Sequence, residues 1–199
     1  MHILFSNLLL FTTVLFVTGC MPMKSHHFYS PSAEGGVVEK SGCNETVGPK
    51  DTIEFIRNNV VIEVSAYETE NSFGVFLLLE IPRGRQVRLA NNYVQITTSS
   101  EAGLFEGTIE PIVPYGPIPD QRSWRVEELL VGETTEFKVL LGTATHGKFF
   151  AMRADVNMQI SDMLTVQLPD LIINGVKFAL PEISFKKEKS VEFLVPLNC

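Results

Sequence analysis

The sequence predicts an all-β fold, an antiparallel β-sandwich, on two observations. From about residue 51 onward, apolar and polar residues alternate in short runs, and a period of two places successive side chains on opposite faces of a strand. Turn-forming residues separate these runs roughly every ten residues, which is typical of sandwiches. We prefer an immunoglobulin-like topology. A closed barrel is the alternative, because strand periodicity is the same in both architectures.

The expected strands follow one another along the chain. Val60, Ile62 and Val64 alternate with more polar residues, as in a half-buried strand. Residues 73–81 are nearly all apolar, which predicts a central strand covered on both faces. Further alternating strands are expected over residues 105–113, 137–141, 150–158, 164–168, 183–185 and 191–195.

Turn chemistry falls between these runs. Asn174-Gly175 lies between two apolar triplets and is the strongest hairpin signal in the chain. His146-Gly147 and residues 70–72 predict two further turns, and the charged residues 186–189 are expected at a solvated hairpin tip. No segment has a sustained helical stripe, so residues 121–130 are only a short helical candidate.

The N-terminal residues carry an export signature. Residues 3–17 are almost all apolar, and a stretch of about fifteen is short for a membrane-spanning helix, which needs roughly twenty. The stretch ends in Val17-Thr18-Gly19-Cys20, which resembles the lipobox of bacterial lipoproteins: an aliphatic residue, a small one, Gly or Ala, then Cys. The start, Met1-His2, departs from that family because it lacks the usual Lys or Arg. An uncleaved N-terminal membrane helix is the alternative.

The resemblance implies a chain in three parts. Residues 1–19 would be the lipoprotein signal peptide, and Cys20 would carry the diacylglycerol and palmitate that anchor the chain. Residues 20–42 contain Pro, Ser and Gly with little apolar pattern, which predicts a flexible tether, and residues 43–199 would form the sandwich domain. Met21, rather than Asp, follows the cysteine. In bacteria with two membranes this implies an outer-membrane lipoprotein facing the periplasm.

The two other cysteines, Cys43 and Cys199, are expected to form a disulfide. An even pair in an exported chain favours a bridge, because an oxidising compartment lets it persist. The bridge would close a loop of more than 150 residues, for which chain entropy gives an upper figure of about 4–5 kcal/mol. Two unpaired thiols near the chain ends are the alternative.

The charge balance excludes two classes of partner. The formal net charge is −7, and the longest basic run is Lys186-Lys187. The electrostatic footprint of a nucleic-acid-binding protein is therefore missing. The same acidity argues against docking by charge on an anionic lipid surface. The membrane partner is expected to be reached through the N-terminal lipid.

The sequence offers little catalytic chemistry. The expected domain has one histidine, His146, in an apparent turn, and no nucleophile elbow, phosphate-binding glycine loop or zinc motif is present. Acidic residues that could act as a hydrolytic pair are expected on ordinary surface; they are Glu127, Glu128, Asp155 and Asp162. The Met and His residues between positions 21 and 27 make a weak metal site. We expect no cofactor, no metal and no enzyme activity.

The most unusual segment is residues 110–124, which holds four prolines and the only tryptophan. Long loops on a rigid sandwich are where binding is usually carried. Tyr115, Arg122, Trp124 and Arg125 therefore form a candidate partner-binding loop, for which a second envelope protein is the expected partner. The alternative, which we favour, is that Trp124 and Ile118 fold back to cap one end of the core.

The sequence thus favours a lipid-anchored, non-catalytic interaction or structural module in the periplasm. An envelope hydrolase that uses carboxylates and a small-ligand-binding lipoprotein are the alternatives.

Overall fold

The computed structural model describes residues 23–40, 48–69, 72–82, 84–99, 103–111, 126–131, 134–139, 148–158 and 161–193. The chain divides into two units, residues 27–188 and the terminal stretches 1–26 with 189–199. The packing described below is that of the first unit.

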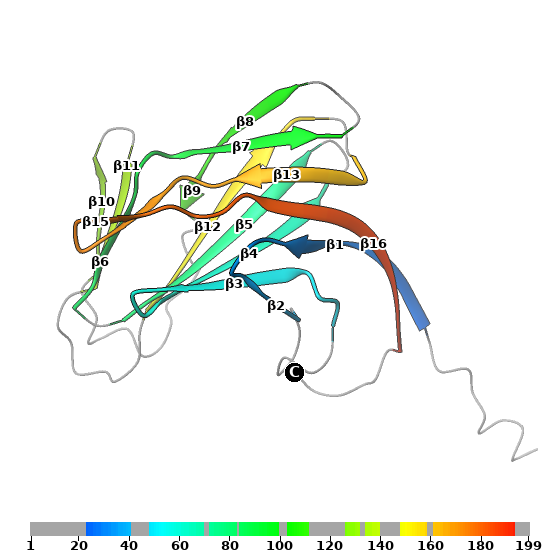
Figure 1. Ribbon diagram of the computed structural model, residues 1–199, viewed down its shortest axis with the longest axis horizontal. Coiled ribbons are helices and arrows are strands. Elements are labelled where there is room, and N and C mark those ends of the chain that lie inside the picture. Colours follow the sequence, from blue (N-terminus) through cyan, green and yellow to red (C-terminus); the bar gives the residue numbers. More distant parts are fainter. Residues whose placement is uncertain are drawn as a thin grey trace, which may run out of the picture. The chain divides into compact units, whose positions relative to one another are not determined.

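Every regular element in the described residues is a β-strand (Figure 1). The strands are β1 (Met23–Ser32), β2 (Val37–Glu39), β3 (Thr52–Arg57), β4 (Val60–Glu68), β5 (Phe73–Ile81), β6 (Gln86–Leu89), β7 (Tyr93–Thr98), β8 (Leu104–Thr108), β9 (Glu110–Pro111), β10 (Val126–Val131), β11 (Thr134–Val139), β12 (Lys148–Val156), β13 (Met163–Gln167), β14 (Leu171–Ile173), β15 (Val176–Phe178) and β16 (Ile183–Phe193).

These strands form three sheets. The orders are β2-β3-β4-β5-β12-β9, β1-β16-β13-β7-β8 and β10-β11-β6-β14-β15. The strand pairs with a known register are antiparallel, such as β4 with β5 and β13 with β7. The predicted all-β, antiparallel sandwich is confirmed, and none of the sheets closes into a barrel. Consecutive strands change sheet repeatedly, for example from β5 to β6 and from β8 to β9.

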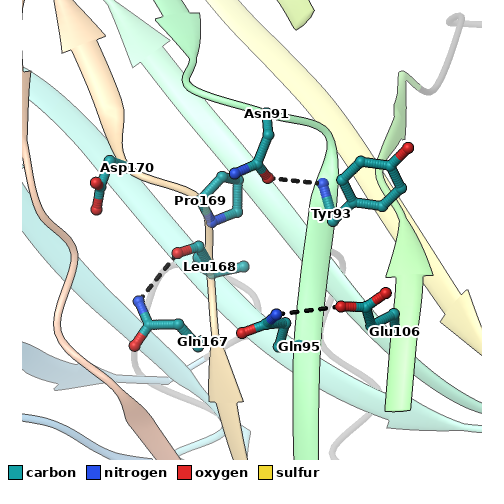
Figure 2. A pocket seen from close by; sticks show the side chains of 8 residues that line it. All are labelled: Asn91, Tyr93, Gln95, Glu106, Gln167, Leu168, Pro169 and Asp170. Carbon is teal, nitrogen blue, oxygen red and sulfur yellow. Dashed lines mark hydrogen bonds between the residues drawn. The ribbon is translucent and has the colours of Figure 1, made fainter. Parts of the chain in front are cut away.

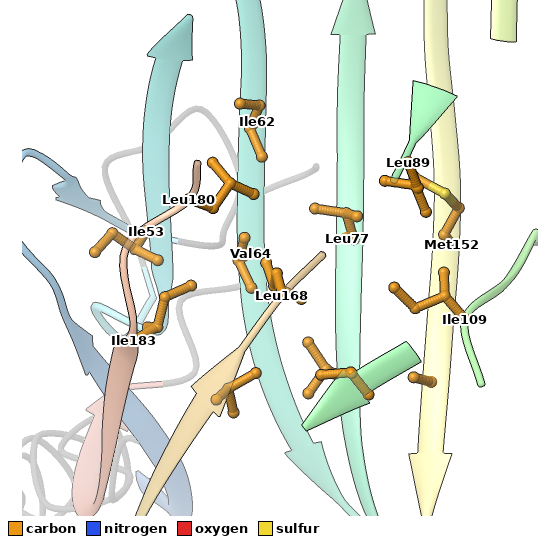
Figure 3. Close-up of a cluster of buried hydrophobic side chains, with 14 of the residues drawn as sticks. Ile53, Ile62, Val64, Leu77, Leu89, Ile109, Met152, Leu168, Leu180 and Ile183 are labelled. Atoms are coloured by element: carbon orange, nitrogen blue, oxygen red, sulfur yellow. The ribbon is translucent and has the colours of Figure 1, made fainter. Parts of the chain in front are cut away.

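The first two of these sheets, which contain β4 and β13 respectively, share one apolar core (Figure 3). Ile53, Ile62 and Leu77 from the first sheet lie in the same buried cluster as Ile96 and Ile183 from the second. This burial follows from the period of two, because each strand places alternate side chains between the sheets. The predicted inward residues of β12 are confirmed, since its alternate apolar side chains are all buried or half-buried; they are Phe150, Met152, Ala154 and Val156.

The position of the central strand β5 was predicted correctly, but the prediction that both of its faces are buried was wrong. It pairs with β4 on one side and β12 on the other over residues 73–81. Its inward residues are fully buried, whereas Phe76, Leu78 and Glu80 on the other face are only half-buried. The strand is therefore central within its sheet, and its outer face is partly open to solvent.

Two tight turns connect strands through left-handed backbone. Asn174 and Gly175 have φ values of 51° and 82°, as the type I′ hairpin predicted at that position requires. The β3–β4 hairpin uses Asn58 and Asn59, with φ values of 51° and 64°. Asparagine tolerates this conformation better than other non-glycine residues, so the Asn-Asn pair was a readable turn signal that the sequence analysis missed.

The predicted tether, residues 20–42, is wrong over its described part. β1 and β2 occupy much of residues 23–40, and the Tyr29 side chain is only 2% exposed within the core cluster. Pro31 is also buried. The interpretation failed because, within residues 25–40, only these two side chains turn fully inward, too few to produce a visible alternation. The sandwich therefore begins well before residue 43.

Two further expectations were wrong. The charged run at residues 186–189 is no hairpin tip, because it lies within the continuous strand β16. A strand accommodates this run since the Lys187 ammonium is paired with Glu68. The helical candidate at residues 121–130 is a strand from residue 126 on, where β10 pairs with β11. Its remaining residues lie outside the described part of the chain.

Candidate functional site

The residues predicted for lipidation, the disulfide and the partner-binding loop, and the single histidine of the predicted domain, lie outside the described part of the chain. They are Cys20, Cys43, Tyr115, Arg122, Trp124, Arg125, His146 and Cys199. Lipidation, the disulfide and the partner-binding loop therefore stay predictions. Of the four acidic candidates, Asp155 and Asp162 are exposed, as expected for ordinary surface.

The structure instead presents a polar cleft on the outward face of the sheet that contains β7, β8 and β13 (Figure 2). Its volume is about 470 Å³, within the range of roughly 300–1,000 Å³ that is usual for ligand sites. The lining residues are Asn91, Tyr93, Gln95, Glu106, Gln167, Leu168, Pro169 and Asp170. The cleft lies entirely within the unit of residues 27–188.

The cleft forms where two neighbouring chain segments pass from one sheet to another. In the third sheet, β6 pairs with β14, ending at Leu89 opposite Leu171. In the second sheet, β7 pairs with β13, beginning at Gln95 opposite Gln167. Five residues on one segment therefore face only three on the other. This surplus separates the two backbones locally.

The surplus acts as a β-bulge does: it bends the strand and re-aims its side chains. The gap between residues 90–94 and residues 168–170 is bridged by the Ala90 N–H, which donates to the Asp170 carbonyl at 2.8 Å. The buried residues Leu168 and Pro169 lie beneath the opening. Backbone geometry thus creates the hollow and directs polar side chains to its rim.

The rim side chains are held by hydrogen bonds to their neighbours. The Asn91 side-chain oxygen accepts the Tyr93 N–H at 3.0 Å, a local turn that asparagine forms readily. The Gln95 amide donates to Glu106 at 3.1 Å across β7 and β8. Each of these side chains therefore has a preferred orientation before any ligand arrives.

Gln167 is fixed from the other side of the cleft. Its amide nitrogen donates to the Leu168 carbonyl at 3.0 Å and to the Leu180 carbonyl at 3.2 Å. Both protons of that amide are used in this way, and its oxygen is the polar atom left for a ligand. A nearby carboxylate, Asp170, forms a 2.6 Å ion pair with Lys177.

Tyr93 contributes an exposed aromatic ring to this polar surface. The residue is 44% exposed, although tyrosine is large and apolar over most of its area. Its ring projects from β7 toward the side of β8, whereas the side chains of Asn91 and Gln95 lie on the side of residues 167–170 (Figure 2). An exposed tyrosine with few rotors can contribute contact area at low entropic cost.

A second polar cluster lies on the outer face of the first sheet, which contains β4 and β12. The Tyr67 hydroxyl donates to an Asp155 carboxylate oxygen at 2.6 Å, and Arg153 lies 3.5 Å from the same carboxylate. Burial and then the hydrogen bond to Asp155 raise the pKa of Tyr67 to about 12. These contacts join β4 to β12, which indicates a structural role.

A third cluster ties β1 to the rest of the sandwich. The Tyr29 hydroxyl lies 3.2 Å from a Glu68 oxygen and 3.2 Å from the Ser161 carbonyl. Lys187 in turn contacts both Glu68 oxygens, at 2.7 Å and 3.0 Å. Burial and the adjacent Glu68 carboxylate raise the pKa of Tyr29 far above its ordinary value. The hydroxyl is therefore a neutral hydrogen-bond donor inside the core.

In the described ranges, no set of three or more His, Cys, Asp or Glu side chains is arranged to hold a metal ion. Within the same residues, no helix has the length and apolar character needed to cross a membrane.

Comparison with known proteins gave no relative. No family model, curated protein or solved structure matches the chain. The cleft was not predicted from the sequence either, because its residues are polar, scattered and individually ordinary. The readable signal was weak: Asn91-Asn92-Tyr93 and Pro169-Asp170 are turn residues that interrupt two alternating runs.

Proposed function

We propose that this chain is a bacterial lipoprotein whose sandwich domain acts as a non-catalytic binding module in the periplasm. The observation that carries the proposal is the four-residue match to the lipobox, Val17-Thr18-Gly19-Cys20, directly after the apolar stretch. The small residue types next to the cysteine let a peptidase reach an extended backbone, and the cysteine sulfur accepts the diacylglycerol. The lipid would hold the domain at the outer membrane.

A binding role is supported by the way the cleft side chains are arranged. Gln95 is held by Glu106, and Gln167 is held by two main-chain carbonyls. Groups fixed in advance lose little entropy when a ligand binds, which favours recognition. The Asp170 carboxylate is likewise engaged by Lys177.

A carboxylate hydrolase is the second candidate, because two carboxylates, Glu106 and Asp170, line one cleft. Glycoside hydrolysis uses such a pair, one as acid and the other as base or nucleophile. The two carboxylates lie at opposite ends of the cleft in Figure 2, however, and each already has a partner in the protein. This arrangement favours binding over turnover.

The anchor is tested by isolating the chain from bacterial membranes and measuring the mass of its N-terminal peptide. We expect a peptide that begins at Cys20 with a diacylglyceryl thioether. Cys20→Ser should block lipid attachment and move the protein to the soluble periplasmic fraction. Unchanged processing and membrane partitioning of this variant would overturn the lipoprotein proposal.

The outer-membrane destination is tested separately, by density separation of the two membranes. The chain should sediment with the outer membrane. Met21→Asp should shift it to the inner membrane, whereas Met21→Ala should not. The same distribution for all three proteins would contradict the sorting proposal without affecting the anchor.

A further inference from the structure

The cleft between β7 and residues 168–170 presents a specific mixture of chemical groups. Three side-chain amides line it, from Asn91, Gln95 and Gln167. An amide offers donors and acceptors side by side, and so does an alcohol. A ligand that carries several neighbouring hydroxyl groups could therefore form hydrogen bonds with more than one of these side chains.

The charges and the apolar surface of the cleft narrow the class of ligand. Two carboxylates, Glu106 and Asp170, line the cleft; Lys177 offsets the charge of Asp170, and the carboxylate of Glu106 would repel an anion. The apolar surface is limited to Tyr93, Leu168 and Pro169, so a lipid tail would leave the surrounding polar groups unpaired, which is costly. A neutral polyhydroxylated ligand fits both constraints.

The exposed ring of Tyr93 could bind the apolar face of such a ligand. A pyranose ring has hydroxyl groups around its edge and C–H groups on its faces. An aromatic ring covers the apolar face of the sugar while adjacent polar side chains bind the edge. Tyr93 is 44% exposed and its ring lies on the Glu106 side of β7 at the edge of the cleft (Figure 2), which puts a stacking surface at the rim of the hydrogen-bonding groups.

The hydrogen bonds inside the cleft leave particular atoms available. The Gln95 amide nitrogen and the Gln167 amide nitrogen are both directed to protein acceptors. Their amide oxygens are the acceptors for ligand hydroxyl protons. The second Glu106 oxygen is a further acceptor, because Gln95 contacts only Oε1. Hydroxyl groups, which donate, are the natural counterpart of such a set.

We propose that this cleft is a binding site for a neutral saccharide, with Tyr93 stacking on a pyranose ring and Gln95, Gln167 and Glu106 accepting its hydroxyl protons. The inference deepens the proposed binding role and rests on it, but it does not depend on the lipid anchor. In the periplasm, such a ligand would be a glycan of the cell envelope.

The test uses the full mature chain, purified in a detergent without a sugar headgroup, because a glycoside detergent would compete for the site. The protein is applied to an array of neutral, sulfated and sialylated oligosaccharides. The neutral glycan with the strongest signal is then titrated by calorimetry. We expect binding to neutral glycans and weaker or no binding to the anionic ones.

Substitutions in the cleft test whether the saccharide binds there. Tyr93→Ala and Gln95→Ala should each weaken binding by roughly tenfold or more, as loss of a central contact does. Tyr93→Phe should retain most of the affinity, since the ring remains. Thr97→Ala is the matched control, because Thr97 is exposed on the same face of β7 and does not line the cleft. Melting temperatures of the four variants should stay near that of the wild type.

Three results would overturn the proposal. One is the absence of binding to any neutral glycan, and another is a preference for anionic glycans. The third is binding that survives both alanine substitutions in folded protein, because it would place the sugar elsewhere. The lipid anchor is tested separately, by the mass of the Cys20 peptide. Failure of the saccharide proposal can therefore be distinguished from failure of the lipoprotein proposal. Release of smaller sugars from the bound glycan would instead support the hydrolase.

Discussion

The hydroxyl of Tyr67 on β4 donates a 2.6 Å hydrogen bond to Asp155 on β12, across the strand that separates them. Both residues are opposite Gly74 of β5 in the strand registers. The tyrosine ring lies over the glycine where a side chain would otherwise stand. A missing side chain on the central strand thus makes room for a contact between its two neighbours.

The raised pKa of Tyr67 predicts a stability loss at high pH. The pKa is about 12 in the folded protein and 10.0 for an ordinary tyrosine, so the folded state holds the phenolic proton more tightly. The resulting stabilisation is complete below pH 10 and is lost as the pH rises through 12. Urea unfolding of wild type and Tyr67→Phe across this range measures the effect.

The comparison of the two proteins isolates Tyr67, because Tyr29 is present in both. Below pH 10, Tyr67→Phe should be less stable by about 0.5–1.5 kcal/mol, the net value of one hydrogen bond. The difference should shrink toward pH 12. A constant difference over the whole range would contradict the assigned cause of the pKa shift.

Gly74→Ala should destabilise the protein through the ring of Tyr67. A methyl group at position 74 would overlap the tyrosine ring, and such overpacking typically costs about 1–3 kcal/mol. In the Tyr67→Ala background the same substitution should cost much less, because the ring is gone. Chemical denaturation of the four proteins forms a double-mutant cycle. Additive costs would show that the ring and position 74 do not interact.

The core position of Tyr29 predicts that β1 is essential to the domain. Tyr29→Ala should lower the free energy of unfolding by about 3–5 kcal/mol, as for other buried aromatic residues. The ring also packs edge-on against Phe73, with centroids 5.2 Å apart. His27→Ala is the control, because His27 is exposed on the same strand and surface changes cost little. Equal stability of the two variants would contradict a structural role for β1 and would support the tether instead.

Much of the fold could be predicted from the sequence, because the patterns that indicate its strands and turns lie within a few neighbouring residues. Val60, Ile62 and Val64 are fully buried, and their alternation with half-buried neighbours is visible in any window of a few residues. The same holds for Asn174-Gly175, whose backbone requirement is met by the two residues themselves. Elements with a strong internal period or a turn of their own could therefore be predicted.

The segments that were misread depend on distant partners. The charged residues of β16 are acceptable in a strand because Lys187 meets Glu68, which lies far away in the sequence. Tyr29 is inward because Phe73 and Ser161 receive it. Without those partners, a charged run indicates a loop, and a short Ser- and Pro-containing segment indicates a tether.

The cleft could not be predicted for the same reason. It depends on the difference between two registers, Leu89 with Leu171 and Gln95 with Gln167. Each pairing joins residues more than 70 positions apart, and a register is set by the packing of whole strands. Five polar side chains of ordinary surface type become one site only when that mismatch brings them around a hollow.

The predicted disulfide between Cys43 and Cys199 is tested by peptide mapping without reduction. Chain produced in the periplasm should give a linked pair of fragments. Cys43→Ser and Cys199→Ser should each lose up to about 4–5 kcal/mol of stability, the entropic limit for so long a loop. Addition of a reductant should then have no further effect on either variant. Two thiols that react freely in unreduced protein would contradict the bridge.

The last prediction concerns the proline-rich loop with Tyr115 and Trp124. Prolines restrict the free chain, so less entropy is lost when the loop is immobilised in a complex. Tyrosine and tryptophan recur at the energetic centres of interfaces, and Arg122 and Arg125 add local positive charge to an acidic protein. If the loop binds a protein partner, Tyr115→Ala with Trp124→Ala should leave the melting temperature nearly unchanged.

The same double variant should then recover fewer crosslinked partners from intact cells. Arg122→Ala with Arg125→Ala should weaken recovery more at low salt than at high salt, because salt screens exposed charges. The competing arrangement, in which Trp124 caps the core, predicts the opposite: a lowered melting temperature, because a buried tryptophan truncated to alanine typically costs about 3–5 kcal/mol. A stable variant with an unchanged crosslinking pattern would count directly against the loop as a binding element.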